Sequence, residues 1–274
     1  MSHRFSSRSL LKPIRRLAKQ AFRRLGYDVS RLSRDAGSAA RSVGDMRMLL
    51  EDLRARGLFL RSILDVGANR GHWSRMAKDV FPTVNCFLLE PQIEMSAYLE
   101  AFCQEFPGSQ WFLAGAGACP GELILTIWDD LAGSSFLPPE SEKLQGAGKQ
   151  RRVPIITINS LIENGAIPMP QLVKLDIQGF ELEALRGGQL LFGSTEVFIL
   201  ESSLFRFIKG WPLLHEVIAF MADRGYFVYD FPGFLRRPYD GALGQTDICF
   251  VKHNGLLRAK DNWSLLPEIF DATV

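Results

Sequence analysis

One stretch of the chain constrains its fold more than any other. Residues 62–66 form a short apolar run that leads into a glycine-containing turn, Gly67-Ala68-Asn69-Arg70-Gly71, and a second apolar run ends at Glu90, 23 residues after Gly67. An apolar strand that enters a glycine turn and a helix, followed by a strand that ends in an acid, is how an α/β sheet builds a nucleoside pocket. The pattern therefore predicts an enzyme built on such a sheet.

Size and composition fit one α/β domain with an attached segment. The chain has 274 residues, of which 47% are hydrophobic, and it can bury a full core. No apolar run reaches the roughly 18 residues that a membrane-spanning helix needs, so we expect a soluble, cytoplasmic body. The four cysteines include no C-x-x-C pair, which indicates neither a disulfide framework nor a zinc site.

The charge is distributed unevenly along the chain. Of the 32 Lys/Arg and 30 Asp/Glu, residues 1–41 hold 11 and 2, which leaves 21 and 28 for residues 42–274. A basic arm thus precedes an acidic body. Between Leu10 and Leu25 apolar residues recur at helical spacing, with cations on the other face.

Such a helix in the arm, residues 10–25, fits peripheral contact with an anionic membrane. Packing of its apolar stripe against the body is the alternative, and a mitochondrial presequence is a third interpretation because the arm is rich in Arg and Ser and poor in acids. Nucleic acid is not expected as a partner, since the body behind the arm is acidic.

Along the body, predicted strands and helices alternate, as in a mostly parallel sheet with helices on both faces. We expect strands at 62–66, 85–90, 110–114, 172–176, 196–201, 226–231 and 247–252, and helices near 45–56, 72–80, 92–105, 181–187 and 213–224. Within an insertion at about 120–158, residues 122–128 and 152–158 are typical of extra strands, and 129–149 form a loop rich in Gly, Ser and Pro. Loops of this length in a compact domain are usually functional or disordered, and the position of this one favours a function.

The glycine turn and the acid after it suggest distinct roles. Asp65 closes a buried strand, Gly67 permits a sharp turn, and Gly71 lets the next helix pack close to the strand. A dinucleotide-binding turn would have a further glycine in place of Asn69, because a pyrophosphate must approach the backbone there. Glu90 stands at the interval at which an acid reaches ribose hydroxyls, although a surface role before Pro91 is the alternative.

Two motifs in order resemble the FkbM family of S-adenosylmethionine-dependent methyltransferases. They are Leu64-Asp65-Val66-Gly67-Ala68-Asn69-x-Gly71 with Glu90-Pro91, and Val173-Lys174-Leu175-Asp176-Ile177-Gln178-Gly179-Phe180-Glu181. The likeness covers roughly residues 60 to 255. It implies an α/β, class I methyltransferase (Rossmann-like) sheet of seven strands with the last one antiparallel. It also implies O-methylation of a hydroxyl on a sugar, glycan, glycolipid or secondary metabolite.

The resemblance implies S-adenosylmethionine as the methyl donor and assigns its contacts. Asp65, Gly67 and Gly71 would line the methionine side, with Ala68 and Asn69 between them, and Glu90 would hold the ribose. Gly115 and Ala116, after the third strand, would contact the adenine. Asn69 fits the pattern of the family and thereby favours a methyl donor over a dinucleotide.

Three acids are candidates for catalysis. The protein must align the groups that react and exclude water, and a base would activate an acceptor hydroxyl. Asp176, at the end of the fourth main strand, is the first candidate for that base or for orienting the acceptor, and capping of the next turn is its alternative role. Glu181 resembles an acid of the family, but it would also complement a helix dipole. Glu201 ends the fifth strand and either faces the acceptor or is structural.

The long loop supplies Ser134 and Ser135 as candidate acceptor-binding residues, with a solvated Gly-Ser turn as the alternative. No His or Cys cluster accompanies the acids, so we predict no metal. Two rival functions remain at this stage. One is an NAD-dependent oxidoreductase on a similar sheet, and the other is a membrane-peripheral adaptor that binds a nucleoside without turnover.

Overall fold

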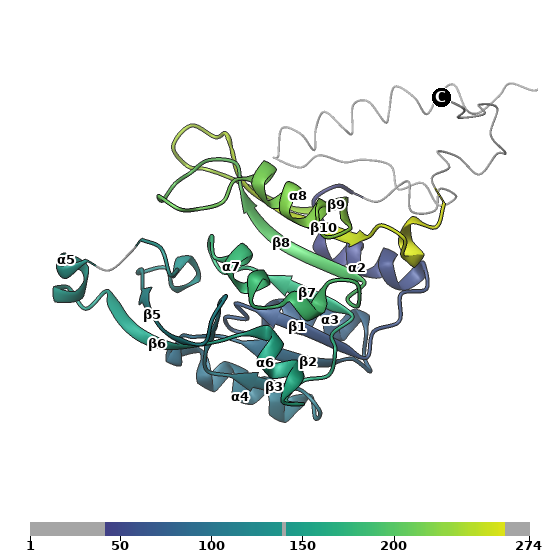
Figure 1. Ribbon diagram of the computed structural model, residues 1–274, viewed down its shortest axis with the longest axis horizontal. Coiled ribbons are helices and arrows are strands. Elements are labelled where there is room, and N and C mark those ends of the chain that lie inside the picture. The colour runs from purple at the N-terminus through teal and green to yellow at the C-terminus, as the bar shows by residue number, and fades with distance from the viewer. Residues whose placement is uncertain (1–41, 139–140, 261–274) are drawn as a thin grey trace, which may run out of the picture. The chain divides into compact units, whose positions relative to one another are not determined.

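The computed structural model describes residues 42–138 and 141–260, which build a large sheet flanked by helices and a smaller sheet at one side (Figure 1). The predicted basic arm lies outside the described residues. Within the described part of the chain, no helix has the length and apolar character needed to cross a membrane.

The large sheet has seven strands in the order β3-β2-β1-β7-β8-β10-β9. Their bounds are β1 Ser62–Val66, β2 Asn85–Leu89, β3 Gln110–Phe112, β7 Leu172–Leu175, β8 Val197–Ser203, β9 Tyr226–Arg236 and β10 Leu243–Lys252. Neighbours from β3 to β8 pair in parallel, and β10 runs antiparallel to both β8 and β9. This confirms the predicted seven-stranded class I arrangement. The strand order changes direction between β1 and β7, where such sheets form a crevice at the strands' carboxyl ends.

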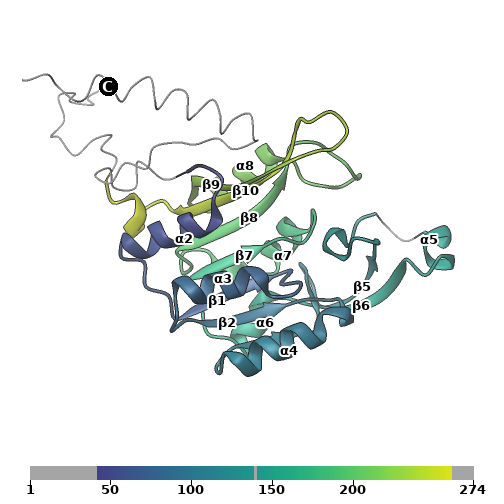
Figure 2. The ribbon, with the colours of Figure 1, turned by 180° about the vertical axis from the view of Figure 1, so that it is seen from behind.

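Helices cover both faces of this sheet, because alternate strand residues point to opposite sides. Ile63 belongs to the buried cluster shared with α2 (Met46–Ala55), α3 (His72–Val80) and α4 (Ser96–Glu105), on the face seen in Figure 2. Leu64 belongs to the cluster shared with α6 (Ile158–Glu163), α7 (Glu181–Arg186) and α8 (Leu214–Ala222). All five residues of β1 are buried, as expected for a central parallel strand.

The segment between β3 and β7 folds as a second sheet. Its strands are β4 (Gly115–Ala116), β5 (Gly121–Thr126) and β6 (Gln150–Ile156), in the order β4-β6-β5. A separate apolar cluster supports it, formed by Leu125, Phe136, Val153 and Ile155. The predicted loop within it contains a short 3-10 segment, Leu131–Gly133, and the helix α5, Glu142–Gly146.

Several boundaries differ from the sequence-based expectation: for example, β9 extends to Arg236 and β10 begins at Leu243, where the sequence pattern predicts strands at 226–231 and 247–252. The third strand stops at Phe112, because the chain leaves the large sheet and Gly115 and Ala116 pair with β6. Ile158 begins the helix α6 and does not end a strand. The reason is a helix cap at Thr157, whose side chain accepts a hydrogen bond from the Ser160 backbone N–H at 3.1 Å.

Candidate active site

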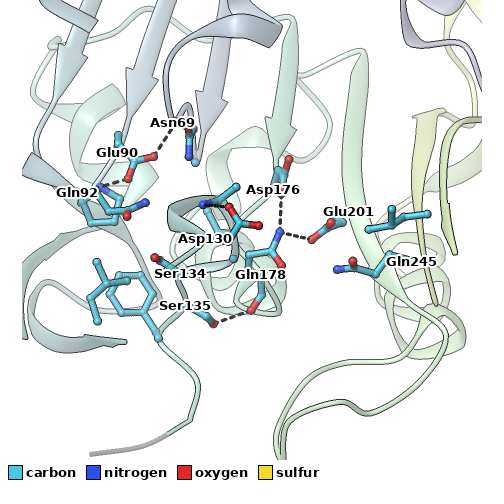
Figure 3. Close-up of a pocket in the computed structure, with 18 residues that line it drawn as sticks. Asn69, Glu90, Gln92, Asp130, Ser134, Ser135, Asp176, Gln178, Glu201 and Gln245 are labelled. Atoms are coloured by element: carbon cyan, nitrogen blue, oxygen red, sulfur yellow. Dashed lines mark hydrogen bonds between the residues drawn. The ribbon is translucent and has the colours of Figure 1, made fainter. Parts of the chain in front are cut away.

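A cavity of about 440 Å³ opens at the carboxyl ends of the central strands (Figure 3). Four parts of the chain line it: the glycine turn, the residues after β2, the loop after β5, and the ends of β7, β8 and the β9–β10 pair. The polar residues among them are Asn69, Glu90, Gln92, Asp130, Ser134, Ser135, Asp176, Gln178, Glu201 and Gln245. Figure 3 shows Glu90 and Asn69 at one end and Glu201 and Gln245 at the other.

The glycine turn packs tightly against the end of β7. Gly67 has φ of +81°, and a Cβ atom there would lie 2.0 Å from the carbonyl oxygen of Asp176. Only glycine fits, because both the backbone conformation and the space exclude a side chain. The backbone N–H groups of Gly67 and Ala68 both donate to the Leu89 carbonyl, at 2.9 and 3.1 Å. The turn is therefore held between β2 and β7 and faces the cavity.

Glu90 is held rigidly at one end of the cavity. Its Oε2 accepts a hydrogen bond from the Asn69 backbone N–H at 2.8 Å, and its Oε1 accepts one from the Gln92 backbone N–H at 3.0 Å. Burial raises the pKa of Glu90, and these two backbone bonds oppose the rise. Since each carboxylate oxygen has a second lone pair, Glu90 keeps the capacity to accept hydroxyl protons from a ligand.

Asp65 lies beneath the glycine turn and outside the cavity lining. It is fully buried, accepts a hydrogen bond from Ser74 Oγ at 2.6 Å, and lies 3.8 Å from Lys174 Nζ. Burial raises the pKa of Asp65, while the Lys174 charge lowers it. For Lys174, burial acts to lower the pKa, but the charges of Asp176 and Asp65 outweigh it and raise the pKa. Asp65 thus helps to fix the lysine that contacts Asp176.

A hydrogen-bonded series links the two acids at the other end. Lys174 Nζ donates to Asp176 Oδ2 at 3.1 Å, and Gln178 Nε2 donates both to Asp176 Oδ1 at 3.1 Å and to Glu201 Oε2 at 2.9 Å. Gln178 has φ of +53°, a conformation that non-glycine residues adopt rarely and mostly at functional sites. Burial, followed by repulsion from Asp176, raises the pKa of Glu201 well above its ordinary value. The series thus places the Asp176 carboxylate, which accepts hydrogen bonds, beside Glu201, which retains its proton to a higher pH than an ordinary glutamate.

Glu181 lies outside the cavity lining. It is 1% exposed, and its Oε1 accepts hydrogen bonds from the backbone N–H groups of Ile177 and Gly179. Burial raises its pKa to about 7, against the effect of these bonds. Glu181 therefore fixes the turn that carries Asp176 and Gln178, and it is a positioning residue with no contact to the cavity.

The loop after β5 is tied to both ends of the cavity. Ser135 Oγ donates to the Gln178 carbonyl at 2.6 Å, and Gln92 Nε2 donates to the Leu131 carbonyl at 3.1 Å. Two buried polar atoms at this surface, Ser134 Oγ and Gln92 Oε1, have no hydrogen-bond partner within the described ranges. They are positioned for a ligand, because a buried polar atom without a partner costs free energy.

The structure brings together seven of the predicted site residues: Gly67, Asn69, Glu90, Ser134, Ser135, Asp176 and Glu201. Asp65, Ala68, Gly71 and Glu181 support the lining from behind. Gly115 and Ala116 lie in β4 outside the lining, since the ring of Phe136 covers Gly115, and their contact with adenine stays a prediction. Sequence reasoning missed the polar lining residues Gln92, Asp130, Gln178 and Gln245, of which only Gln178 stood inside a recognised motif.

The comparisons with known proteins identify the class. A family model described as "Methyltransferase FkbM domain" matches residues 65–228. Together with the seven-stranded sheet and its cavity, this defines an S-adenosylmethionine-dependent methyltransferase, as predicted. The chain belongs to the FkbM methyltransferase family.

Solved structures with similar folds are distant in sequence. Precorrin-6y C5,15-methyltransferase from Geobacter metallireducens GS-15 has 16% identity over 75% of this chain and 87% of that chain, with a TM-score of 0.42. Burkholderia thailandensis 1,6-didemethyltoxoflavin-N1-methyltransferase, solved with S-adenosylhomocysteine, has 9% identity over 92% and 93%, with a TM-score of 0.41. Aeropyrum pernix fibrillarin, solved with S-adenosyl-L-methionine, has 10% identity over 71% of each chain, with a TM-score of 0.41. A search of the curated proteins gave no significant match.

Proposed function

We propose that this methyltransferase acts on a hydroxyl group of a sugar, glycan, glycolipid or related metabolite. The observation that carries the proposal is the series Asp176–Gln178–Glu201 at the end of the cavity opposite Glu90. A hydroxyl needs one partner that accepts its proton and one that donates to its oxygen, and this series offers both within one hydrogen-bonded unit.

The charge of the cavity supports the choice of donor. Four acids line it, Glu90, Asp130, Asp176 and Glu201, and no Lys, Arg or His of the described residues does. S-adenosylmethionine supplies an electrophilic methyl group on a positively charged sulfur, which suits such surroundings. The pyrophosphate of NAD would be repelled, so we set the oxidoreductase alternative aside.

Residues at the Glu90 end of the cavity would hold the donor. The Glu90 carboxylate, already oriented by two backbone N–H groups, would accept the ribose hydroxyl protons. The unpartnered Oε1 of Gln92 would accept from an N–H or O–H of the same ligand. Gly67, which has no side chain, would contact the ligand through its backbone, since it lies in the cavity lining.

On the acceptor side, Asp176 would take up the hydroxyl proton. Its two oxygens already accept hydrogen bonds from Lys174 and Gln178, which fix its orientation, and its side chain is 35% exposed toward the cavity. Glu201, whose pKa is raised first by burial, would donate a hydrogen bond to a neighbouring oxygen of the acceptor. Ser134 Oγ, buried and unpartnered among the described residues, would bind a further hydroxyl.

Calorimetric titration of the full chain with S-adenosylmethionine tests donor binding. We expect micromolar affinity, no affinity for NAD, and a loss of about 1–3 kcal/mol in Glu90→Ala, since ribose hydroxyls would lose their acceptor. Glu100→Ala, an exposed glutamate of α4, is the control and should bind like the parent. A folded protein that fails to bind the donor would contradict the proposal.

Transfer of a labelled methyl group to hydroxylated sugars and lipid-linked glycans tests the acceptor. The product should carry the label as an O-methyl ether, and Asp176→Asn should bind the donor normally but turn over more slowly. A label on nitrogen or carbon would refute the proposed acceptor chemistry. If the parent and Asp176→Asn both bind the donor equally and neither transfers a methyl group to any acceptor, the result would support the alternative of an adaptor without turnover.

A further inference from the structure

A second basin adjoins the acceptor end of the active-site cavity. This basin has a volume of about 290 Å³ and is lined by residues from the end of β9, the start of β10 and the segment after β8. Leu235 and Gln245 line both the active-site cavity and the basin. The two spaces are therefore adjacent, and a ligand larger than one hydroxylated ring would reach from one to the other past these two side chains.

The basin has an apolar floor that is accessible to a ligand. Phe207 is 45% exposed and Leu235 is 59% exposed. Gly244 lies beside Phe207, and a Cβ atom at Gly244 would already touch that ring at 3.4 Å and Arg237 Cβ at 3.3 Å. The absence of a side chain at Gly244 thus keeps the floor open. An exposed aromatic ring in a concave site suits the apolar face of a ligand ring.

The rim of the basin carries two arginines with different partners. Arg237 forms an ion pair with Asp240, at 2.7 Å from Nε and 2.5 Å from Nη2. Arg236 Nη1 donates to the Gly241 carbonyl at 2.8 Å, and no carboxylate of the described residues pairs with it. Arg236 therefore keeps an uncompensated positive charge and free N–H donors. A guanidinium in this state binds phosphate or carboxylate oxygens well.

The charges of the two spaces are opposite. Acids alone supply the charged lining of the active-site cavity, whereas both charged residues that line the basin are arginines. An anionic substituent would be repelled from the first space and attracted to the second. Gln245 lies where they join, its side-chain amide has no hydrogen-bond partner in the described part of the chain, and Figure 3 shows it extending toward Glu201.

We propose that the basin is a second subsite for the acceptor and that it selects a sugar derivative with an anionic group, a phosphate or a carboxylate. Arg236 binds the anionic group, Phe207 packs against an apolar ring face, and Gln245 contacts the part between the two spaces. The inference rests on the proposed function, because it assumes that the acceptor hydroxyl lies beside Asp176 and Glu201.

The test is binding of matched sugars to the full chain loaded with S-adenosylhomocysteine. Glucose, glucose 1-phosphate and glucuronic acid are the probes, and calorimetry or ligand-observed NMR reports their affinity. We expect the two anionic probes to bind at least about tenfold more tightly than glucose, the effect of one charge-assisted hydrogen bond. Their comparison distinguishes a phosphate from a carboxylate preference.

Matched variants locate the effect. Arg236→Gln should remove the preference for the anionic probes, whereas Arg61→Gln, just before β1 at the amino ends of the parallel strands, should retain it. Both should bind S-adenosylhomocysteine as the parent does. Equal affinity for neutral and anionic probes, binding of none of them, or a preference that survives in Arg236→Gln would overturn the inference. Failure of the parent to bind S-adenosylhomocysteine would instead defeat the proposed function.

Discussion

Asp247 on β10 is the register partner of Glu201 on β8. Paired residues of antiparallel strands project to the same face of a sheet, so the two carboxyl groups influence each other. Burial raises the pKa of Asp247 to about 6, Asp176 adds to the rise, and Lys174 opposes it. Gly233 on β9 leaves room for Asp247, since a Cβ atom there would lie 2.1 Å from Oδ2. Asp247 thus belongs to the same cluster of acidic side chains as Asp176 and Glu201.

Asp247→Asn should lower the pKa of Glu201. Burial is the main cause of the raised value and stays, but the variant removes one of the negative charges that add to it. Carbon-13 NMR titration of the glutamate carboxyl groups measures the change directly. Asp223→Asn, an exposed residue after α8, serves as the control. An unchanged or higher Glu201 pKa in Asp247→Asn would show that the two acids do not interact.

Gly67→Ala should destabilise the protein more than Gly193→Ala. Both glycines have φ near +80°, but nothing lies within 4 Å of a Cβ at Gly193, whereas one at Gly67 meets backbone at 2.0 Å. For Gly193→Ala we expect the free energy of unfolding to fall by about 1–2 kcal/mol, from the left-handed conformation alone. For Gly67→Ala we expect it to fall by at least about 2 kcal/mol more, from the steric clash. Chemical denaturation measures both. Equal losses would mean that the turn moves away from β7.

The stability that depends on Glu181 should decrease as pH rises. The folded protein binds this proton more tightly than the unfolded chain, because burial raises the pKa from 4.5 to about 7. Its contribution is complete below pH 4.5 and is lost as pH rises through about 7. Glu181→Gln keeps an oxygen acceptor for the Ile177 and Gly179 N–H groups and should flatten this dependence, by at most about 3 kcal/mol.

Denaturation of the parent and Glu181→Gln across this pH range provides the comparison. Glu183→Gln, at a partly exposed neighbour in α7 that pairs with Arg186, controls for the general effect of a lost charge. Parallel stability profiles for the parent and Glu181→Gln would disprove the buried titration.

Gln178→Gly should slow catalysis without weakening donor binding. Glycine accepts the φ of +53° readily, so the backbone turn should persist. The loss of two hydrogen bonds to carboxyl groups should reduce kcat by roughly 10- to 100-fold. Measurement of kcat beside the Kd of S-adenosylhomocysteine separates the two effects. An unchanged kcat would assign Gln178 a purely structural role.

The part of the site around Glu90 was predictable because it is local in sequence. One strand-turn-helix-strand unit contains Gly67, Asn69 and Glu90, and strand periodicity with glycine chemistry places them at the same edge. The second motif likewise placed Asp176 correctly at the end of a strand. The two roles weighed for Glu181 could not be separated by sequence, since its burial depends on how α7 packs on the sheet.

The rest of the site depends on pairings between distant segments. Asp247 and Gln245 reach it only because β10 inserts antiparallel between β8 and β9. Gln92 matters through its bond to Leu131, 39 residues later. The positive φ of Gln178 has no signature in its residue type. The register of the strands and the backbone of one turn decide these positions, and neither follows from the local pattern.

The three-stranded sheet supplies part of the cavity lining. It has its own apolar cluster and brings Leu125, Ser134, Ser135 and Phe136 to the cavity. Its side-chain links to the segment after β2 include Gln92 to Leu131 and Glu94 to Arg151. Under the proposed function, exchange of residues 121–156 between related chains, with these two links preserved, should change which acceptors are methylated and leave the residues around Glu90 untouched.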